Sequence, residues 1–166
     1  MNVPKKLDEK EILHYAKKYE VSVADNYELD TTYFSFLFSH DTAVYKYQIK
    51  NHYQPMQALY YDKSEQLQSF QINCYAGGFP NLNWNRNGIF QVFPPKNQAP
   101  IDSLVPLSEQ LKHLHKLSSS TEISVNNYDY IVLVFWNRFG GRQSKRLIHF
   151  VQDNAKLTDK KVKIIY

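Results

Sequence analysis

The residues with the clearest chemical potential lie in one short segment near the end of the sequence. Gly140-Gly141 precedes a run in which Arg142, Lys145 and Arg146 recur at helical spacing. Two glycines at a helix start leave backbone N–H groups free to bind an anion, and cations on one helix face would add positive charge. Cations in a first helical turn oppose the helix dipole. The segment therefore indicates either an anionic ligand or acidic partner, or a solvated helix face.

Charge is concentrated in the same region. The 166 residues carry a net charge of +4, and residues 137–166 contain eight Lys or Arg against two Asp, a local charge of +6. Such a segment attracts acidic proteins or anions. The glycine patterns of nucleotide-binding loops, zinc ligands and the aromatic sheet motif of RNA-binding folds are absent from the sequence. We expect an acidic protein or a small anion as partner, with an anion or nucleic-acid binder using the helix start at 140–146 as the alternative.

A second candidate surface lies in an asparagine-rich stretch around Trp84 and Arg86. Its first interpretation is a recognition surface for a peptide or glycan, with Trp84 as the anchor and Arg86 as the polar contact. Its second interpretation is a series of Asx turns with Trp84 packed inward.

Nucleophilic and metal chemistry have few candidates. Cys74 is the single cysteine, which excludes an intramolecular disulfide and a cysteine-based zinc cluster. It is either a buried inert thiol or, with a histidine beside it, the nucleophile of an enzyme. His113 and His115 would face different ways on a helix, and Asp102 and Glu109 offer no recognisable acid/base pair. We expect no metal and no cofactor.

Composition places the chain among globular proteins, with 43% hydrophobic residues, enough for one domain over residues 1–166. No apolar run reaches the roughly 18 residues of a membrane span. The first six residues contain no apolar core of a signal peptide. The chain is then cytoplasmic, or belongs to the cell envelope or periplasm if a leader was removed.

Helix and strand signals divide the first two thirds of the chain. Residues 1–55 read as helical, with caps at Asp8, at Thr31 or Thr32, and at Asp41. Residues 56–61 and 67–75 predict an antiparallel hairpin, and residues 76–106 a long loop. Ser108 is expected to cap a helix reaching Leu117, followed by a short strand over 121–125.

The last third predicts a βαβ unit. Residues 130–136 form a continuous apolar run, the pattern of a strand buried on both faces. Residues 142–155 have helical spacing of apolar side chains, and residues 161–166 predict a second strand. Two strands joined by a helix should be parallel, with a right-handed crossover.

The segment 135–143, Phe-Trp-Asn-Arg-Phe-Gly-Gly-Arg-Gln, resembles the centre of a thioredoxin-like fold. That family has an apolar strand, F-W-x-x-W/F, then C-x-x-C opening a helix, then a strand of the type K-V-x-I, here residues 161–164. The resemblance covers about 40 residues. It places the two family cysteines at Gly140 and Gln143, and neither residue can take part in thiol–disulfide exchange.

The fold expected is therefore α/β (α+β), with a thioredoxin-like βαβ core at 130–166. The resemblance implies that further strands of the family would follow residue 166, so either the sequence is a piece of a longer one or upstream strands take their place. The upstream hairpin at 56–75 is expected to complete a mixed sheet, because a bare βαβ unit leaves an exposed edge. This implies a non-catalytic, redox-inactive binding or interaction module. Residues 72–80 with Trp84 and Arg86 are also similar to uncharacterised lipoproteins of Bacteroidetes, which implies the cell envelope.

Overall fold

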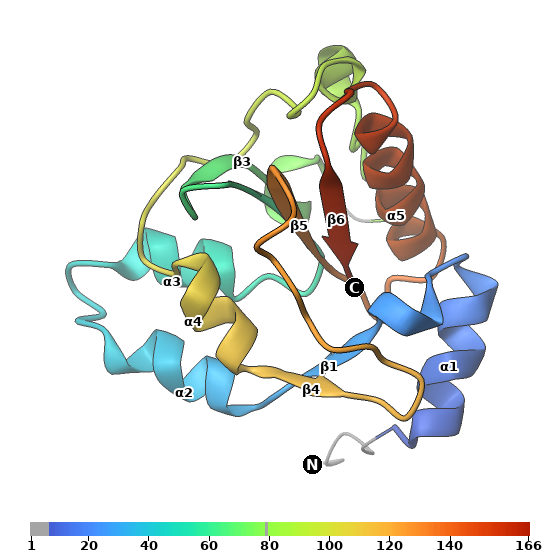
Figure 1. Cartoon of the computed structure of the whole chain (residues 1–166). Helices are drawn as coiled ribbons and strands as arrows, with labels where there is room; N and C mark the ends of the chain where they lie inside the picture. Colours follow the sequence, from blue (N-terminus) through green and yellow to red (C-terminus); the bar gives the residue numbers. More distant parts are fainter. Residues whose placement is uncertain (1–6, 79) are drawn as a thin grey trace.

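The computed structural model describes residues 7–78 and 80–166, with helices on both sides of a central sheet (Figure 1). The expectation on a signal peptide concerns residues outside this part. The elements are α1 (Glu9–Lys18), a 3₁₀ turn (Val23–Asp25), β1 (Tyr27–Leu29), α2 (Thr32–Ser39), α3 (Lys46–His52), β2 (Gln57–Asp62), β3 (Leu67–Ile72), 3₁₀ turns at Asn73–Tyr75 and Arg86–Gln91, α4 (Leu107–Lys112), β4 (Leu114–Lys116), β5 (Tyr130–Phe135), α5 (Arg142–Ala155) and β6 (Val162–Ile165).

The central sheet has the strand order β3-β2-β5-β6. β5 and β6 are parallel and connected through α5, as the βαβ pattern predicts. The hairpin β2–β3 is antiparallel, and β2 also pairs antiparallel with β5, with Gln57 opposite Phe135. The α+β class and the mixed sheet completed by the upstream hairpin are therefore confirmed.

Strand β5 is buried on both faces because its side chains alternate between two cores. Val132 and Val134 pack in the core that contains the apolar side of α5, and Ile131 and Leu133 in the core beneath α4. Because both faces of β5 are buried, its residues are apolar without alternation, which is the continuous apolar run seen in the sequence.

Residues 25–27 lie beside the end of β6 and join the two sheets. Tyr27 N–H donates to Tyr166 O at 2.7 Å, and Tyr166 N–H donates to Asp25 O at 2.9 Å. β1 then pairs antiparallel with β4 to form the smaller sheet, seen below the central sheet in Figure 1. This second sheet has no counterpart in the sequence predictions.

Helices α1, α2 and α5 begin where the sequence predicts. The cap predicted for α2 at Thr31 or Thr32 is wrong, because the Asp30 carboxylate accepts from Thr32 N–H at 2.7 Å and Thr31 makes no capping hydrogen bond. The Asp8 carboxylate accepts a hydrogen bond from Glu11 N–H at 2.8 Å, which is the predicted N-cap. The third helix begins later than expected. Asp41 Oδ1 accepts from Ala43 and Val44 N–H, so it caps a turn, and α3 itself begins at Lys46.

Three predictions in the region 107–125 are wrong. Ser108 does not cap the helix, because α4 begins at Leu107 with Pro106 in the N-cap position. The helix expected to reach Leu117 ends at Lys112, and residues 114–116 form β4 because they pair with β1. Residues 121–125 form no strand. Thr121 N–H and Oγ1 instead donate to Ala24 O in the 3₁₀ turn, at 2.9 and 3.1 Å.

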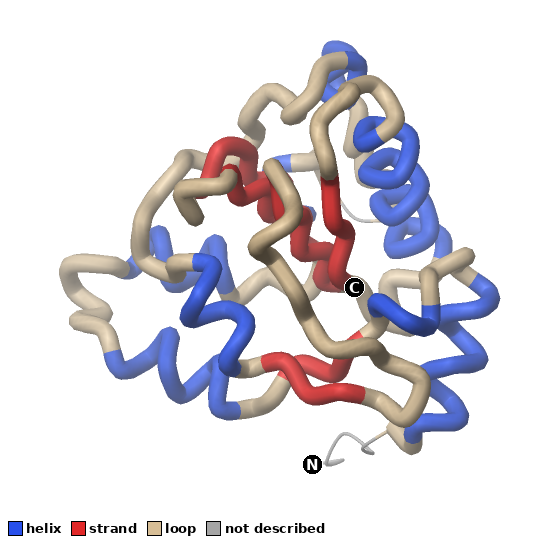
Figure 2. The backbone as a smooth tube through the Cα atoms, in the orientation of Figure 1, coloured by secondary structure: helices blue, strands red, loops and turns tan. Residues whose placement is uncertain are grey.

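The predicted long loop between β3 and α4 is largely irregular apart from its 3₁₀ turn (Figure 2). Part of it covers the outer edge of β3. Phe70 N–H donates to Asn97 Oδ1 at 2.9 Å, and Ala99 N–H donates to Phe70 O at 3.0 Å. The loop thereby satisfies backbone groups of an edge strand that would otherwise be unpaired.

Candidate functional site

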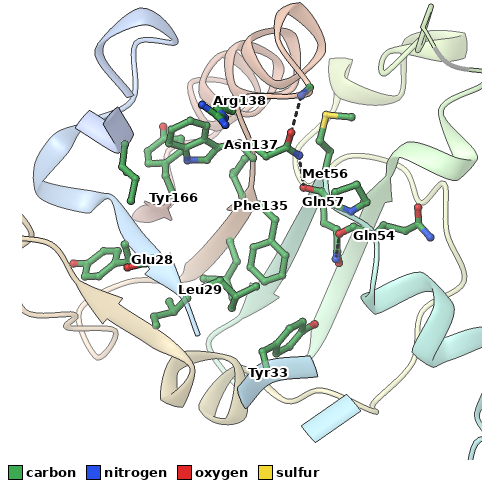
Figure 3. Close-up of a pocket in the computed structure, with 18 of the residues that line it drawn as sticks. Glu28, Leu29, Tyr33, Gln54, Met56, Gln57, Phe135, Asn137, Arg138 and Tyr166 are labelled. Carbon is green, nitrogen blue, oxygen red and sulfur yellow. Dashed lines mark hydrogen bonds between the residues drawn. The ribbon is translucent and has the colours of Figure 1, made fainter. Parts of the chain in front are cut away.

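A cavity of about 810 Å³ lies at the carboxyl ends of β5 and β6 (Figure 3). Its lining residues come from nearly the whole length of the chain: Leu7, Ile12, Tyr15, Tyr27, Glu28, Leu29, Tyr33, Phe34, the run from His52 to Gln57, Leu114, the run from Leu133 to Gly140, Ile165 and Tyr166. The volume is in the range of sites for small molecules.

The walls of the cavity are mainly apolar and aromatic. Leu133 and Ile165 belong to the core beneath α4, and Leu29 and Leu114 lie directly opposite each other in the small sheet. Figure 3 shows Tyr33 at one end of the cavity and Arg138 at the other, with Phe135 between them.

A small number of polar side chains interrupt this lining. Gln57 is only 1% exposed, and its Nε2 donates to the carbonyls of His52 and Gln54 at 2.7 and 2.5 Å. Glu28 and Arg138 are the charged side chains of opposite sign on the lining. Few polar groups in an apolar pocket are typical of a site that orients its ligand.

The turn between β5 and α5 lines the cavity and includes Phe139, which is 84% exposed, so we call this end of the cavity its mouth. Asn137 holds the turn in place. Asn137 Oδ1 accepts from Gly140 N–H at 2.6 Å, and its Nδ2 donates to Pro55 O at 3.1 Å (Figure 3). Ser144 Oγ donates to Asn137 O at 2.8 Å. The turn is therefore tied both to the loop before β2 and to the first turn of α5.

Close packing and backbone conformation explain why this turn contains two glycines. A Cβ at Gly140 would lie 2.4 Å from Ser144 Oγ and 2.7 Å from Met56 Sδ. Gly141 has φ of +48°, a conformation that residues with side chains rarely adopt. The expectation that these glycines leave N–H groups for an anion is wrong, because Gly140 N–H donates to Asn137 Oδ1 and Gly141 N–H to Arg138 O.

The predicted cation cluster at the helix start is dispersed. Lys145 Nζ lies 3.1 Å from Glu20 Oε1, and Arg146 Nη1 donates to Leu82 O at 3.0 Å. Arg142 is exposed. The three side chains therefore do not converge on one ligand position, and the anion site expected at residues 140–146 has no support in this geometry.

Trp84 and Arg86 differ in their exposure to solvent. Trp84 is fully buried in the core that contains α5, so it cannot act as the exposed anchor of a recognition surface. Arg86, two residues later, is exposed. The structure agrees with the interpretation in which Trp84 packs inward.

Cys74 is exposed, which corrects the expectation of a buried thiol. Desolvation raises the pKa of this thiol above its ordinary value, although the charge of Lys50 acts in the opposite direction. A nucleophilic cysteine requires a lowered pKa. The structure therefore gives no support to an enzyme that uses Cys74.

Asp102 and Glu109, for which the sequence offers no acid/base partner, each contact a histidine. His52 is fully buried, and its Nε2 lies 2.8 and 3.1 Å from the two oxygens of Asp102. The pair fastens the long loop to the end of α3. Its members are 50 residues apart, so no sequence spacing could indicate it.

The second pair belongs to a chain of three side chains. Thr32 Oγ1 lies 2.9 Å from His113 Nδ1, and His113 Nε2 lies 3.2 Å from Glu109 Oε1. This order resembles a nucleophile, a base and an orienting acid. The first turn of α2 offers no free donors for an oxyanion there, since Thr32 N–H and Tyr33 N–H both donate to Asp30. We interpret the chain as a structural link between α2 and α4.

The carboxylates in this area are held ionised. A hydrogen bond from Thr32 N–H, followed by one from His115, holds the pKa of Asp30 well below its usual range. A hydrogen bond from Lys112, with a smaller contribution from His113, lowers the pKa of Glu109. The prediction that His113 and His115 face different ways assumes that both lie on one helix. His115 lies instead on strand β4.

Comparisons of the chain with protein-family models, with curated proteins and with solved structures find no match. Within residues 7–78 and 80–166, no helix combines the length and apolar character needed to cross a membrane. The same residues contain no group of three or more His, Cys, Asp or Glu side chains placed to hold a metal ion.

Proposed function

We propose that the protein is a non-catalytic, redox-inactive binding module with a thioredoxin-like core, and that its site is the cavity at the carboxyl end of β5. The observation that supports this most directly is the cavity itself, about 810 Å³ with a mainly apolar lining. Open sheets with parallel strands bind ligands beyond the carboxyl ends of those strands, and the cavity has this position relative to β5 and β6.

The absence of redox chemistry follows from the two positions that carry cysteines in thioredoxin-like proteins. Gly140 is packed against Ser144 and Met56, and Gln143 Nε2 donates to Pro80 O at 2.6 Å. Both positions have structural contacts in place of a reactive thiol. We therefore assign this end of the sheet to ligand binding, with an apolar small molecule as the class of ligand.

The test is a titration with N-phenyl-1-naphthylamine, a neutral apolar dye that fluoresces when it leaves water. We expect saturable binding that falls about tenfold or more in Leu29→Trp, because a larger ring would occupy the cavity next to Leu114. Leu157→Trp is the matched control, since Leu157 is 56% exposed and lies outside the lining. Equal binding by the two variants would refute the cavity as the site.

A further inference from the structure

We infer that the ligand of this cavity is a single-chain amphiphile with a carboxylate head group, which Arg138 binds at the mouth while the apolar chain extends toward Tyr33. The inference rests on the proposed function, because it names the ligand class of the same cavity. It begins from the fact that Arg138 is the only Lys or Arg among the described residues that line the cavity.

The guanidinium of Arg138 has unused hydrogen-bonding capacity. It has five N–H donors, yet none of them makes a hydrogen bond within the described part of the chain, and its Nε is buried without a partner. The nearest acid is Glu11, whose Oε1 lies 3.7 Å from Nη1, beyond a normal hydrogen bond. A guanidinium binds carboxylate or phosphate oxygens through two parallel hydrogen bonds, and of these two groups the carboxylate carries the single negative charge.

The surroundings of Arg138 strengthen its attraction for an anion. Its side chain is only 28% exposed, and its guanidinium carbon lies 4.8 Å from the centroid of the Phe139 ring. A charge that is partly shielded from water interacts more strongly with an opposite charge than one at an open surface. Phe139 is itself 84% exposed, so an apolar ring stands beside the cation at the mouth.

The layout of the cavity explains why the rest of the ligand should be a single apolar chain. Figure 3 shows Arg138 and Tyr33 at opposite ends with Phe135 between them, while Glu28 lies at the side. A ligand with one charged end would place its carboxylate at Arg138 and its chain along the apolar wall. A second anionic group near Glu28 would be repelled, which favours a ligand with one negative charge.

The test compares decanoic acid with decanol, which has the same chain and a neutral head group, by displacement of N-phenyl-1-naphthylamine at pH 8. Arg138→Gln should weaken decanoate binding about tenfold or more and leave decanol unchanged. Glu11→Gln should strengthen decanoate binding, because it removes the carboxylate that competes for the guanidinium. Arg142→Gln is the control, since Arg142 is an exposed cation outside the lining.

The outcomes separate the inference from the proposed function. If the dye itself does not bind, the cavity is not a binding site. If the dye binds and decanoate does not displace it, the carboxylate inference is overturned. If decanol and decanoate bind equally and Arg138→Gln changes neither, the cavity stands and the carboxylate inference is overturned. Weaker decanoate binding in Glu11→Gln would also overturn it. Arg138→Lys keeps the charge without the paired donors and should bind decanoate with intermediate affinity. This variant provides the test if Arg138→Gln does not fold.

Discussion

Substitution of Gly140 by alanine tests the structural explanation of the glycine pair at the start of α5. The added Cβ would lie 2.4 Å from Ser144 Oγ and 2.7 Å from Met56 Sδ, so both neighbours would have to move. Neither moves easily. Ser144 Oγ donates to Asn137 O at 2.8 Å and accepts from Asn137 N–H at 3.2 Å, and Met56 is 1% exposed.

The cost follows from these contacts. Overpacking a well-packed interior lowers the free energy of unfolding by about 1–3 kcal/mol. Displacing Ser144 would weaken hydrogen bonds that contribute about 1 kcal/mol each. We therefore expect Gly140→Ala to lose about 2–4 kcal/mol. In a protein of this size that corresponds to a decrease in Tm of roughly 4–16 °C.

The assay is thermal and urea unfolding of Gly140→Ala beside Gly78→Ala. Gly78 is the matched control, because a Cβ there would meet nothing within 4 Å and its φ is not in the left-handed region. The control should unfold within about 0.5 kcal/mol of the wild type. Equal stability of the two alanine variants would refute the packing argument and reopen a ligand-binding explanation for the glycines.

Two further predictions concern buried polar groups. Asp102→Ala leaves His52 Nε2 buried without its acceptor and should lower the free energy of unfolding by about 1.5–3 kcal/mol in a urea titration, whereas Asp159→Ala, at an exposed carboxylate, should have little effect; similar midpoints would show that the His52 pair contributes nothing. Burial raises the pKa of Tyr33, Tyr60 and Tyr61, so their stabilising effect is complete below the ordinary tyrosine pKa of about 10 and is lost as the pH rises above it. An alkaline titration followed by ultraviolet absorbance should show a group of the 13 tyrosines ionising only as the near-ultraviolet circular dichroism disappears, and ionisation of every tyrosine in a folded protein would contradict this.

The elements that the sequence predicts well are those whose signals are local and strong. The helix over residues 142–155 has the predicted bounds because its apolar spacing and the preceding glycines are both read from neighbouring residues. β4 shows the opposite case. Residues 114–116 continue a helical pattern, yet they form a strand because β1, more than 80 residues earlier, supplies its hydrogen-bonding partners, with Glu28 opposite His115. Such pairing outweighs local propensity in short segments.

The candidate site also combines features that local sequence predicts with features that depend on tertiary contacts. Residue order alone predicts that a strand, a turn with two glycines and a cationic helix follow one another at 130–155, and it excludes a cysteine at positions 140 and 143. The tertiary contacts place the turn beside a cavity, engage Lys145 with Glu20 and Arg146 with Leu82 O, and leave Arg138 with a 3.7 Å ion pair to Glu11 and a buried Nε that has no hydrogen-bond partner. Residue types and their spacing along the chain determine local conformation. Whether a charge is paired, or an apolar surface is left open, depends on side chains that arrive from distant parts of the chain.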